Sequence, residues 1–191
     1  MLELFLSLAL GIGLSAACGF RVFVPLLVIS AAARGGFLTL APGFEWMGSY
    51  PALLAFAVAT VVEILAYYVP WVDNALDGVA TPAAVVAGAV ITASMVTGVD
   101  PWLQWTLAVI AGGGAAGIVQ AGTTGLRGPS TLTTGGLDNF FVSTLEWIGA
   151  FTTSLLAVLF PVVALLLVLG LIVFILARWG RRTQPAANSA R

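Results

Sequence analysis

The sequence predicts an all-α, polytopic membrane protein with five or six transmembrane segments, some of them broken or re-entrant. Of its 191 residues, 60% are hydrophobic and only 8% are charged, and the mean hydropathy is +1.08. A soluble domain carries roughly 25% charged residues, so this composition cannot cover a water-facing surface. Apolar runs near the length of a spanning helix, about 20 residues, recur along the chain, and glycine and proline interrupt several of them.

The first half of the chain is expected to hold three spans. The apolar run Leu4–Ala33 contains Gly19, Arg21 and Pro25, so it is either one long kinked helix or a helix broken near the arginine. Residues 34–49 are polar and contain Gly and Pro, which predicts a loop. A second span at 50–70, a loop at 71–82 and a short third span at 83–97 are expected to follow.

The second half is expected to continue with a fourth span at 102–122, which a run of three glycines loosens. This run lacks the context of a phosphate loop and predicts close approach of helices, as do Gly11 and Gly13. Residues 123–138 contain four Gly, one Pro and five Thr and are predicted to be irregular. Residues 139–179 form either two spans or a re-entrant piece followed by one long span.

The chain is expected to fold as a single transmembrane domain, residues 1–179, with a polar tail at 180–191. Arg178, Arg181 and Arg182 at the last membrane exit place the C-terminus in the cytoplasm by the positive-inside rule. Six spans would place the N-terminus on the same side.

The net charge and the scarcity of histidine and cysteine exclude several classes of function. The net charge of −1 argues against a nucleic-acid partner, which requires a basic face. The chain has no histidine and one cysteine, Cys18, so an intrachain disulfide and a Ser/His/Asp triad are excluded and most metal and haem sites are removed. We therefore predict no catalytic residue, no metal and no cofactor, and we do not expect an enzyme.

Two arginines, Arg21 and Arg127, lie in similar Gly-x-Arg frames within or after apolar runs. A charged side chain at membrane depth costs about 2.5–3.5 kcal/mol on insertion scales, and such residues usually mark a pathway. A guanidinium offers a planar five-donor fork for phosphate or carboxylate, so two of them could bind an anion or a lipid headgroup. The alternative is that they form structural ion pairs with Glu63 and Glu146.

Acidic and amide residues accompany both arginines. Glu63 in the second span and Glu146 in a later helix are candidate proton carriers in coupled transport, or counter-ions to the arginines. The full set of predicted pathway residues is Arg21, Arg127, Glu63, Glu146, Asp73, Asp138, Asn74 and Asn139.

The two Gly-x-Arg frames suggest an internal repeat. Aligning Arg21 with Arg127 also aligns two pairs of glycines, but Glu63 precedes its Asp-Asn pair whereas Glu146 follows its own. If the repeat is real and inverted, a transport site would lie near the midplane, built from one broken helix of each half.

Asp73 and Asp77 open an enzymatic alternative, because residues at i and i+4 share one face of a helix and two carboxylates there could bind a divalent cation. The arginine and the downstream aspartate pair of lipid phosphotransferases are missing from this stretch. A solvated loop is the simpler interpretation.

Three stretches, LSAACGFRVFVPLLVISAAARGG, EILAYYVPWVDNALD and GLRGPSTLTTGGLDN, resemble the DUF4126 family of small bacterial integral-membrane proteins. The resemblance covers about Leu4 to Arg178. It implies a single membrane domain in a bacterial cytoplasmic membrane, and it implies no established activity.

These observations favour a small membrane transporter, channel or lipid translocator. Its cargo is expected to be anionic because the cations at membrane depth are guanidinium forks. Besides the lipid bilayer, the expected partners are this small anion or lipid headgroup and a second copy of the chain, since so short a chain often needs one to enclose a pathway. The alternative is a non-transporting scaffold or accessory subunit, in which the Arg–Glu pairs only fix helix register.

Overall fold

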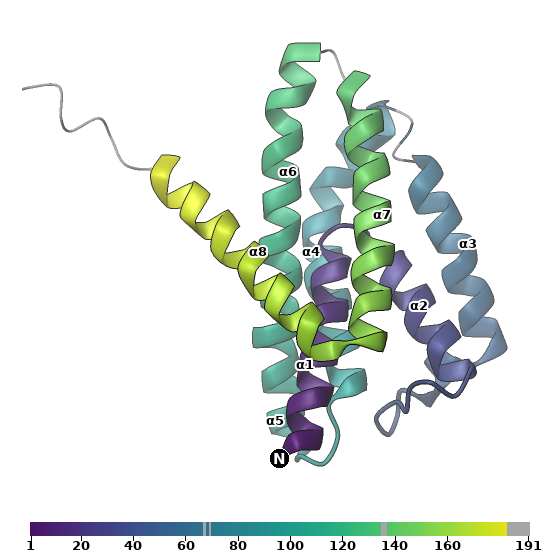
Figure 1. Cartoon of the computed structure of the whole chain (residues 1–191). Helices are drawn as coiled ribbons and strands as arrows, with labels where there is room; N and C mark the ends of the chain where they lie inside the picture. Colours follow the sequence, from purple (N-terminus) through teal and green to yellow (C-terminus); the bar gives the residue numbers. More distant parts are fainter. Residues whose placement is uncertain (67, 69, 135–136, 183–191) are drawn as a thin grey trace, which may run out of the picture.

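The computed structural model describes the backbone of residues 1–66, 68, 70–134 and 137–182, and the side chains of these residues except 70–77, 126–141 and 182. Most of this part of the chain is helical, which confirms the predicted all-α fold class (Figure 1). The elements are α1 (Leu2–Cys18), α2 (Phe23–Arg34), the 3-10 turn η1 (Glu45–Gly48), α3 (Tyr50–Ala66), α4 (Pro70–Met95), α5 (Pro101–Leu107), the π-helical segment η2 (Ala108–Gly113), α6 (Gly114–Thr134), α7 (Leu137–Leu159) and α8 (Pro161–Arg182).

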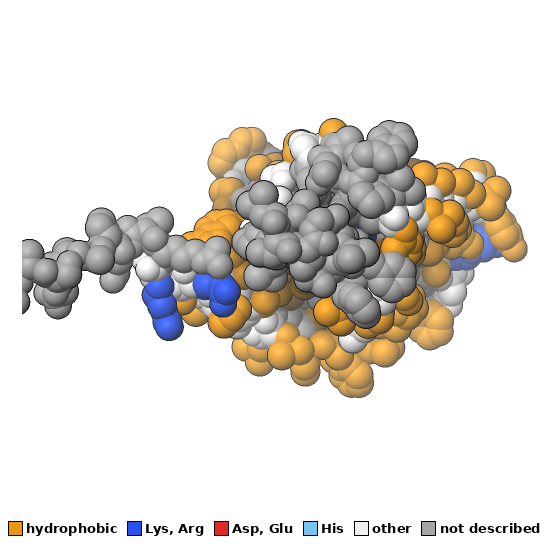
Figure 2. All heavy atoms as spheres, turned by 90° about the horizontal axis from the view of Figure 1, so that it is seen from above, with side chains coloured by type: hydrophobic (Ala, Val, Ile, Leu, Met, Phe, Trp, Pro, Cys, Tyr) orange, Lys and Arg blue, Asp and Glu red, His pale blue; other side chains and the backbone are white. Residues whose placement is uncertain are grey.

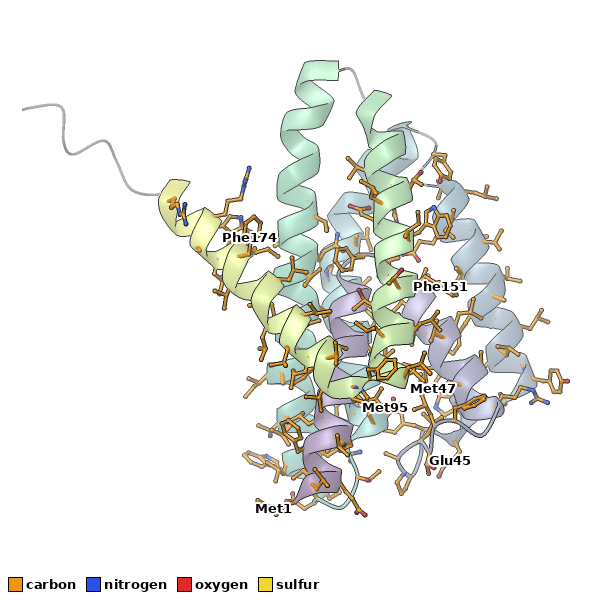
Figure 3. All side chains as sticks on the ribbon, viewed as in Figure 1. Met1, Glu45, Met47, Met95, Phe151 and Phe174 are labelled. Carbon is orange, nitrogen blue, oxygen red and sulfur yellow. The ribbon has the colours of Figure 1, made fainter. Side chains whose placement is uncertain are left out.

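Four helical stretches of the described chain are long and apolar enough to cross a membrane: Gly78–Met95, Pro101–Gly125, Val142–Leu159 and Pro161–Arg181. Three shorter apolar helices, α1, α2 and α3, complete the bundle. Hydrophobic side chains cover much of the outer surface that is visible in Figure 2 and project outward from the ribbon in Figure 3. The chain is therefore a polytopic membrane protein whose apolar faces are suited to lipid.

The first apolar run is broken, and the break makes a helical hairpin. α1 runs up the centre of the bundle, packed against α4, α7 and α8, and α2 returns toward the end where the chain began (Figure 1). Because this hairpin returns to its starting end, the N-terminus and the far end of α8 lie toward opposite ends of the bundle. This arrangement differs from the one-sided placement of the termini that was expected for six spans.

Two segments predicted as non-helical are helical. α4 begins at Pro70 and continues through Pro82, so the predicted loop at 71–82 is wrong. α6 extends to Thr134 and α7 begins at Leu137, so only residues 135–136 of the predicted irregular segment remain, and they lie outside the described residues. Helix satisfies backbone hydrogen bonds without water, and neighbouring helices compensate for glycine and proline, so turn-forming residues are weak signals in a membrane protein.

Two expectations remain: that glycines loosen the fourth span, and that residues 139–179 form either two spans or a re-entrant piece and one long span. The fourth span is a rod of α5, η2 and α6, and its π-helical turn includes Gly112 and Gly113, in agreement with the predicted loosening. After Phe160 the chain reverses and α8 begins at Pro161, so residues 139–179 form two helices. Proline suits this position because the first turn of a helix needs no N–H from it.

Small residues bring the central helices together, as predicted. A Cβ on Gly88 would lie 2.8 Å from the carbonyl oxygen of Gly112, and one on Gly13 would lie 2.9 Å from the Cβ of Ala157. Between α1 and α4, the Ser15 hydroxyl donates to the carbonyl oxygen of Gly88 at 2.6 Å and contacts the Thr92 hydroxyl at 2.8 Å. These contacts fix the register of α1 at the centre of the bundle.

Candidate functional site

The break between α1 and α2, residues 19–22, is specified by its flanking residues. A Cβ on Gly19 would lie 2.5 Å from the Cβ of Val119 and 2.6 Å from the carbonyl oxygen of Ala116, so only glycine allows this approach to α6. Pro25 lies in the first turn of α2, where its missing N–H leaves no intrahelical bond unmade. The backbone thus turns inside the bundle and carries Arg21 with it.

Arg21 is buried in an ion pair with a helix from the other half of the chain. Its Nη2 lies 2.9 Å from Oε2 of Glu146 on α7, and the two side chains are 1% and 5% exposed. Arg21 is among the largest fully buried side chains of the described chain. A guanidinium in an apolar layer needs such a partner, because its solvation by water is lost.

Glu63 binds the other side of the same turn. The backbone N–H of Val22 donates to Oε1 of Glu63 at 2.8 Å, and the N–H of Phe23 donates to Oε2 at 3.0 Å. These are the first N–H groups of α2, which have no intrahelical acceptor. A carboxylate from α3 therefore caps α2 and meets the positive end of its dipole.

A third helix completes the contacts of the turn. The Thr123 hydroxyl on α6 lies 3.4 Å from the carbonyl oxygen of Gly19, and the same hydroxyl donates to the carbonyl oxygen of Gln120 at 2.9 Å. The turn is thus bound from α3, α6 and α7 together. We call the turn at 19–22 with Arg21, Glu63 and Glu146 the Arg21 site.

Two hydroxyl groups near the site were missed by sequence reasoning. Thr60 on α3 and Ser143 on α7 each lie one helical turn before a site glutamate, and they are 7% and 2% exposed. Neither hydroxyl oxygen has a hydrogen-bond partner among the described residues, which is uncommon for buried polar groups. The signal in the sequence is the shared spacing, Thr-x-x-Glu and Ser-x-x-Glu.

A cavity of 370 Å³ lies beside Glu63, between the start of α2 and the facing sides of α3 and α4. Its lining is apolar apart from this carboxylate. The residues are Val22, Phe23, Ala59, Val62, Glu63, Ala66, Val79, Ala80 and Ala83. The cavity thus places one carboxylate in an otherwise apolar wall beside the turn of the Arg21 site.

The other predicted site residues cannot be placed as side chains. Arg127 lies in the C-terminal part of α6, Asp73 and Asn74 near the start of α4, and Asp138 and Asn139 at the start of α7, but their side chains lie outside the described residues. These three helix ends lie at the same end of the bundle (Figure 1). The two Gly-x-Arg frames differ in structure, because the chain breaks at the first and continues as helix through the second.

Removing the carboxylate of Glu63 is expected to loosen the start of α2. In Glu63→Ala the amides of Val22 and Phe23 should exchange with deuterium faster, with a loss of about 1–2 kcal/mol in local stability. Hydrogen exchange of the protein in detergent micelles measures this. Glu45→Ala, which removes a carboxylate bonded to Gly43 in an exposed loop, is the matched control. Unchanged exchange at Val22 and Phe23 would contradict the capping role.

Comparisons with known proteins agree with the resemblance seen in the sequence. A family model described as a domain of unknown function, DUF4126, matches residues 8–181 and so reaches from within α1 to within α8. Comparisons with curated proteins and with solved structures found no match. The chain belongs to the DUF4126 family.

Proposed function

We propose that the protein is a small membrane transporter whose cargo carries an anionic group and passes the Arg21 site. The observation that carries the proposal is the buried ion pair of Arg21 and Glu146 at a helix break, 2.9 Å between Nη2 and Oε2. Ionisable residues in apolar layers mark pathways, and broken helices build the central sites of transporters. The proposal extends to a lipid whose headgroup supplies the anion.

The ion pair supports a mechanism in which cargo and carboxylate compete for one guanidinium. A proton from the donor side binds the Glu146 carboxylate, which then loses its attraction for Arg21. The anionic group of the cargo takes its place on the guanidinium, which binds carboxylate and phosphate alike. When the pair re-forms, cargo and proton leave together on the other side. Transport of a monovalent anion with one proton is then electroneutral.

The surroundings of the pair support the same role. The hydroxyls of Thr60 and Ser143 offer hydrogen bonds that no described residue uses, and both lie one turn from a site glutamate. The cavity beside Glu63 offers an apolar approach. Movement of the α1–α2 hairpin past α3 and α7 would alternate access, since both glutamates bind its turn.

Orientation and assembly follow from the same proposal. We place the protein in the bacterial cytoplasmic membrane with the arginine-rich end of α8 in the cytoplasm, by the positive-inside rule. The N-terminus then lies on the opposite side. We expect a homodimer, because a second copy would help to enclose a pathway in so small a chain.

Flux into proteoliposomes tests the proposal. Chloride, inorganic phosphate and headgroup-labelled phosphatidylglycerol serve as probes, with an entrapped pH dye. We expect uptake of at least one probe with co-movement of protons, a loss of more than tenfold in Arg21→Lys, and uptake that no longer depends on pH in Glu146→Gln. Lysine keeps the charge but not the planar fork. Arg34→Gln is the control, because Arg34 stacks on Tyr50 away from the site.

The scaffold is the second candidate, and the three-helix contacts of the turn favour it. In that case Arg21 and Glu146 only fix the hairpin, and an apolar pair of similar size should replace them. Absence of flux of all three probes above empty liposomes would count against transport and favour the scaffold. Wild-type flux in Arg21→Lys would show that the cargo does not require the guanidinium fork, and would overturn the place of Arg21 in the pathway. The metal-dependent lipid enzyme rests on Asp73 and Asp77, whose side chains lie outside the described residues.

A further inference from the structure

A second cavity lies between α6 and α8, apart from the apolar cavity beside Glu63. α8 packs against α1 and α6 and leans away from the bundle toward its far end (Figure 1). The cavity has a volume of 130 Å³, and its lining is mostly apolar but includes Arg178 and Trp179 from the C-terminal part of α8. The apolar walls come from Phe20, Val119, Gly122, Gly125, Leu171, Phe174 and Ile175, with the hydroxyl-bearing Thr123 among them.

On α8, the apolar residues that line the cavity are followed along the same helix face by a basic residue. Leu171, Ile175 and Arg178 are spaced by four and three residues, so they follow one another along one helix face. Next to them, Phe174, Ala177, Arg178 and Arg181 line an adjoining hollow. Basic side chains gather at this end of α8 in Figure 2, and Phe174 is labelled on the helix in Figure 3.

We propose that this cleft binds one phospholipid with an anionic headgroup. One acyl chain lies between α6 and α8, and the phosphate lies on Arg178 and Arg181. Charge complementarity selects the headgroup, because the guanidinium groups bind the phosphate through N–H donors and repel the choline cation that a zwitterionic headgroup carries beside its phosphate. An apolar cavity of roughly 150 Å³ holds a benzene ring, so a cavity of 130 Å³ takes a short stretch of acyl chain.

Two glycines on α6 keep the cleft open. A Cβ on Gly122 would lie 2.7 Å from Cδ1 of Ile175, whereas a Cβ on Gly125 would meet no atom within 4 Å. Gly125→Leu would therefore fill the cleft without a clash at its Cβ, and leucine favours helix over glycine. This substitution blocks the acyl chain while leaving both arginines in place.

Native mass spectrometry of protein ejected from nanodiscs of mixed phosphatidylglycerol and phosphatidylcholine tests the site. We expect one retained phosphatidylglycerol on the wild-type protein and a loss of roughly fivefold in its retention for each of Arg178→Gln and Arg181→Gln. Gly125→Leu should lose the retained lipid with both arginines intact. Arg34→Gln, which removes an arginine from another part of the molecule, is the matched control and should retain the lipid as the wild type does.

The possible results separate a built site from general attraction to the membrane surface. An equal loss of lipid retention in Arg34→Gln would overturn the proposal. So would unchanged retention in both single variants, Arg178→Gln and Arg181→Gln. A phosphatidylglycerol with a photoreactive acyl chain gives an independent reading, since crosslinks should fall on residues 171–175 of α8 or 119–125 of α6. Crosslinks confined to other helices would overturn it as well. None of these readings depends on transport at the Arg21 site.

Discussion

Glu146→Ala is expected to lower the free energy of unfolding by about 3–5 kcal/mol. The substitution removes the carboxylate that lies 2.9 Å from Nη2 of Arg21 and leaves a guanidinium that is only 1% exposed. The lost Coulomb attraction matters less than the positive charge that remains away from water. Unfolding in detergent micelles, followed by tryptophan fluorescence against denaturant concentration, measures the change.

Two further variants test the cause of this loss. Arg21→Met combined with Glu146→Leu removes both charges and keeps similar volumes, so it should recover most of the stability lost in Glu146→Ala. Glu3→Ala removes an exposed carboxylate from the first turn of α1 and should change stability by less than about 0.5 kcal/mol. A loss below about 1 kcal/mol in Glu146→Ala would show that Arg21 does not depend on this carboxylate.

Gly112→Ala is expected to lower the free energy of unfolding by about 1–3 kcal/mol. An added Cβ would lie 2.5 Å from the carbonyl oxygen of Gly88 and would also meet the Thr92 side chain. The carbonyl oxygen of Gly88 belongs to the backbone, so the clash is relieved only if α4 and the rod of η2 and α6 move apart. Thr92 also contacts the Ser15 hydroxyl of α1, so the strain reaches the centre of the bundle.

Gly114→Ala provides a control two residues away. A Cβ there would meet no atom within 4 Å, so only the change in helix preference remains, and alanine should stabilise by about 0.5–1 kcal/mol. The same denaturation experiment measures both variants. A gain of stability in Gly112→Ala, or a loss of stability in Gly114→Ala, would contradict the close approach of α4 and η2.

The sequence predicted either a kink or a break near Arg21, because the causes of both are local, and the structure shows the break. Gly19 and Pro25 bracket the arginine, and both act on the backbone within a few residues. The loops at 71–82 and 123–138 were predicted from equally local signals, and these predictions were wrong. In an apolar surrounding the backbone gains more from helical hydrogen bonds than turn-forming side chains can offer, so Asn74, Gly78 and Pro82 lie within a helix.

The partners at the candidate site could not be predicted in the same way. Both glutamates were named from the sequence as counter-ions or proton carriers, but nothing local indicates that Glu63 binds backbone N–H groups while Glu146 takes the guanidinium. The hydroxyls of Thr60 and Ser143 escaped notice because burial, which makes them significant, is a property of the packed bundle.

The sequence by itself determined the membrane class, the all-α fold and the small-residue contacts, and it limited the stretch around Arg21 to a kink or a break, because composition, helix periodicity and steric freedom act over short distances. Only the tertiary structure decided that α1 and α2 form a hairpin and that its turn is bound by α3, α6 and α7. The physical reason is that a buried charge is satisfied by whichever helix packing brings within about 3 Å, and packing depends on the shapes of all the helices together.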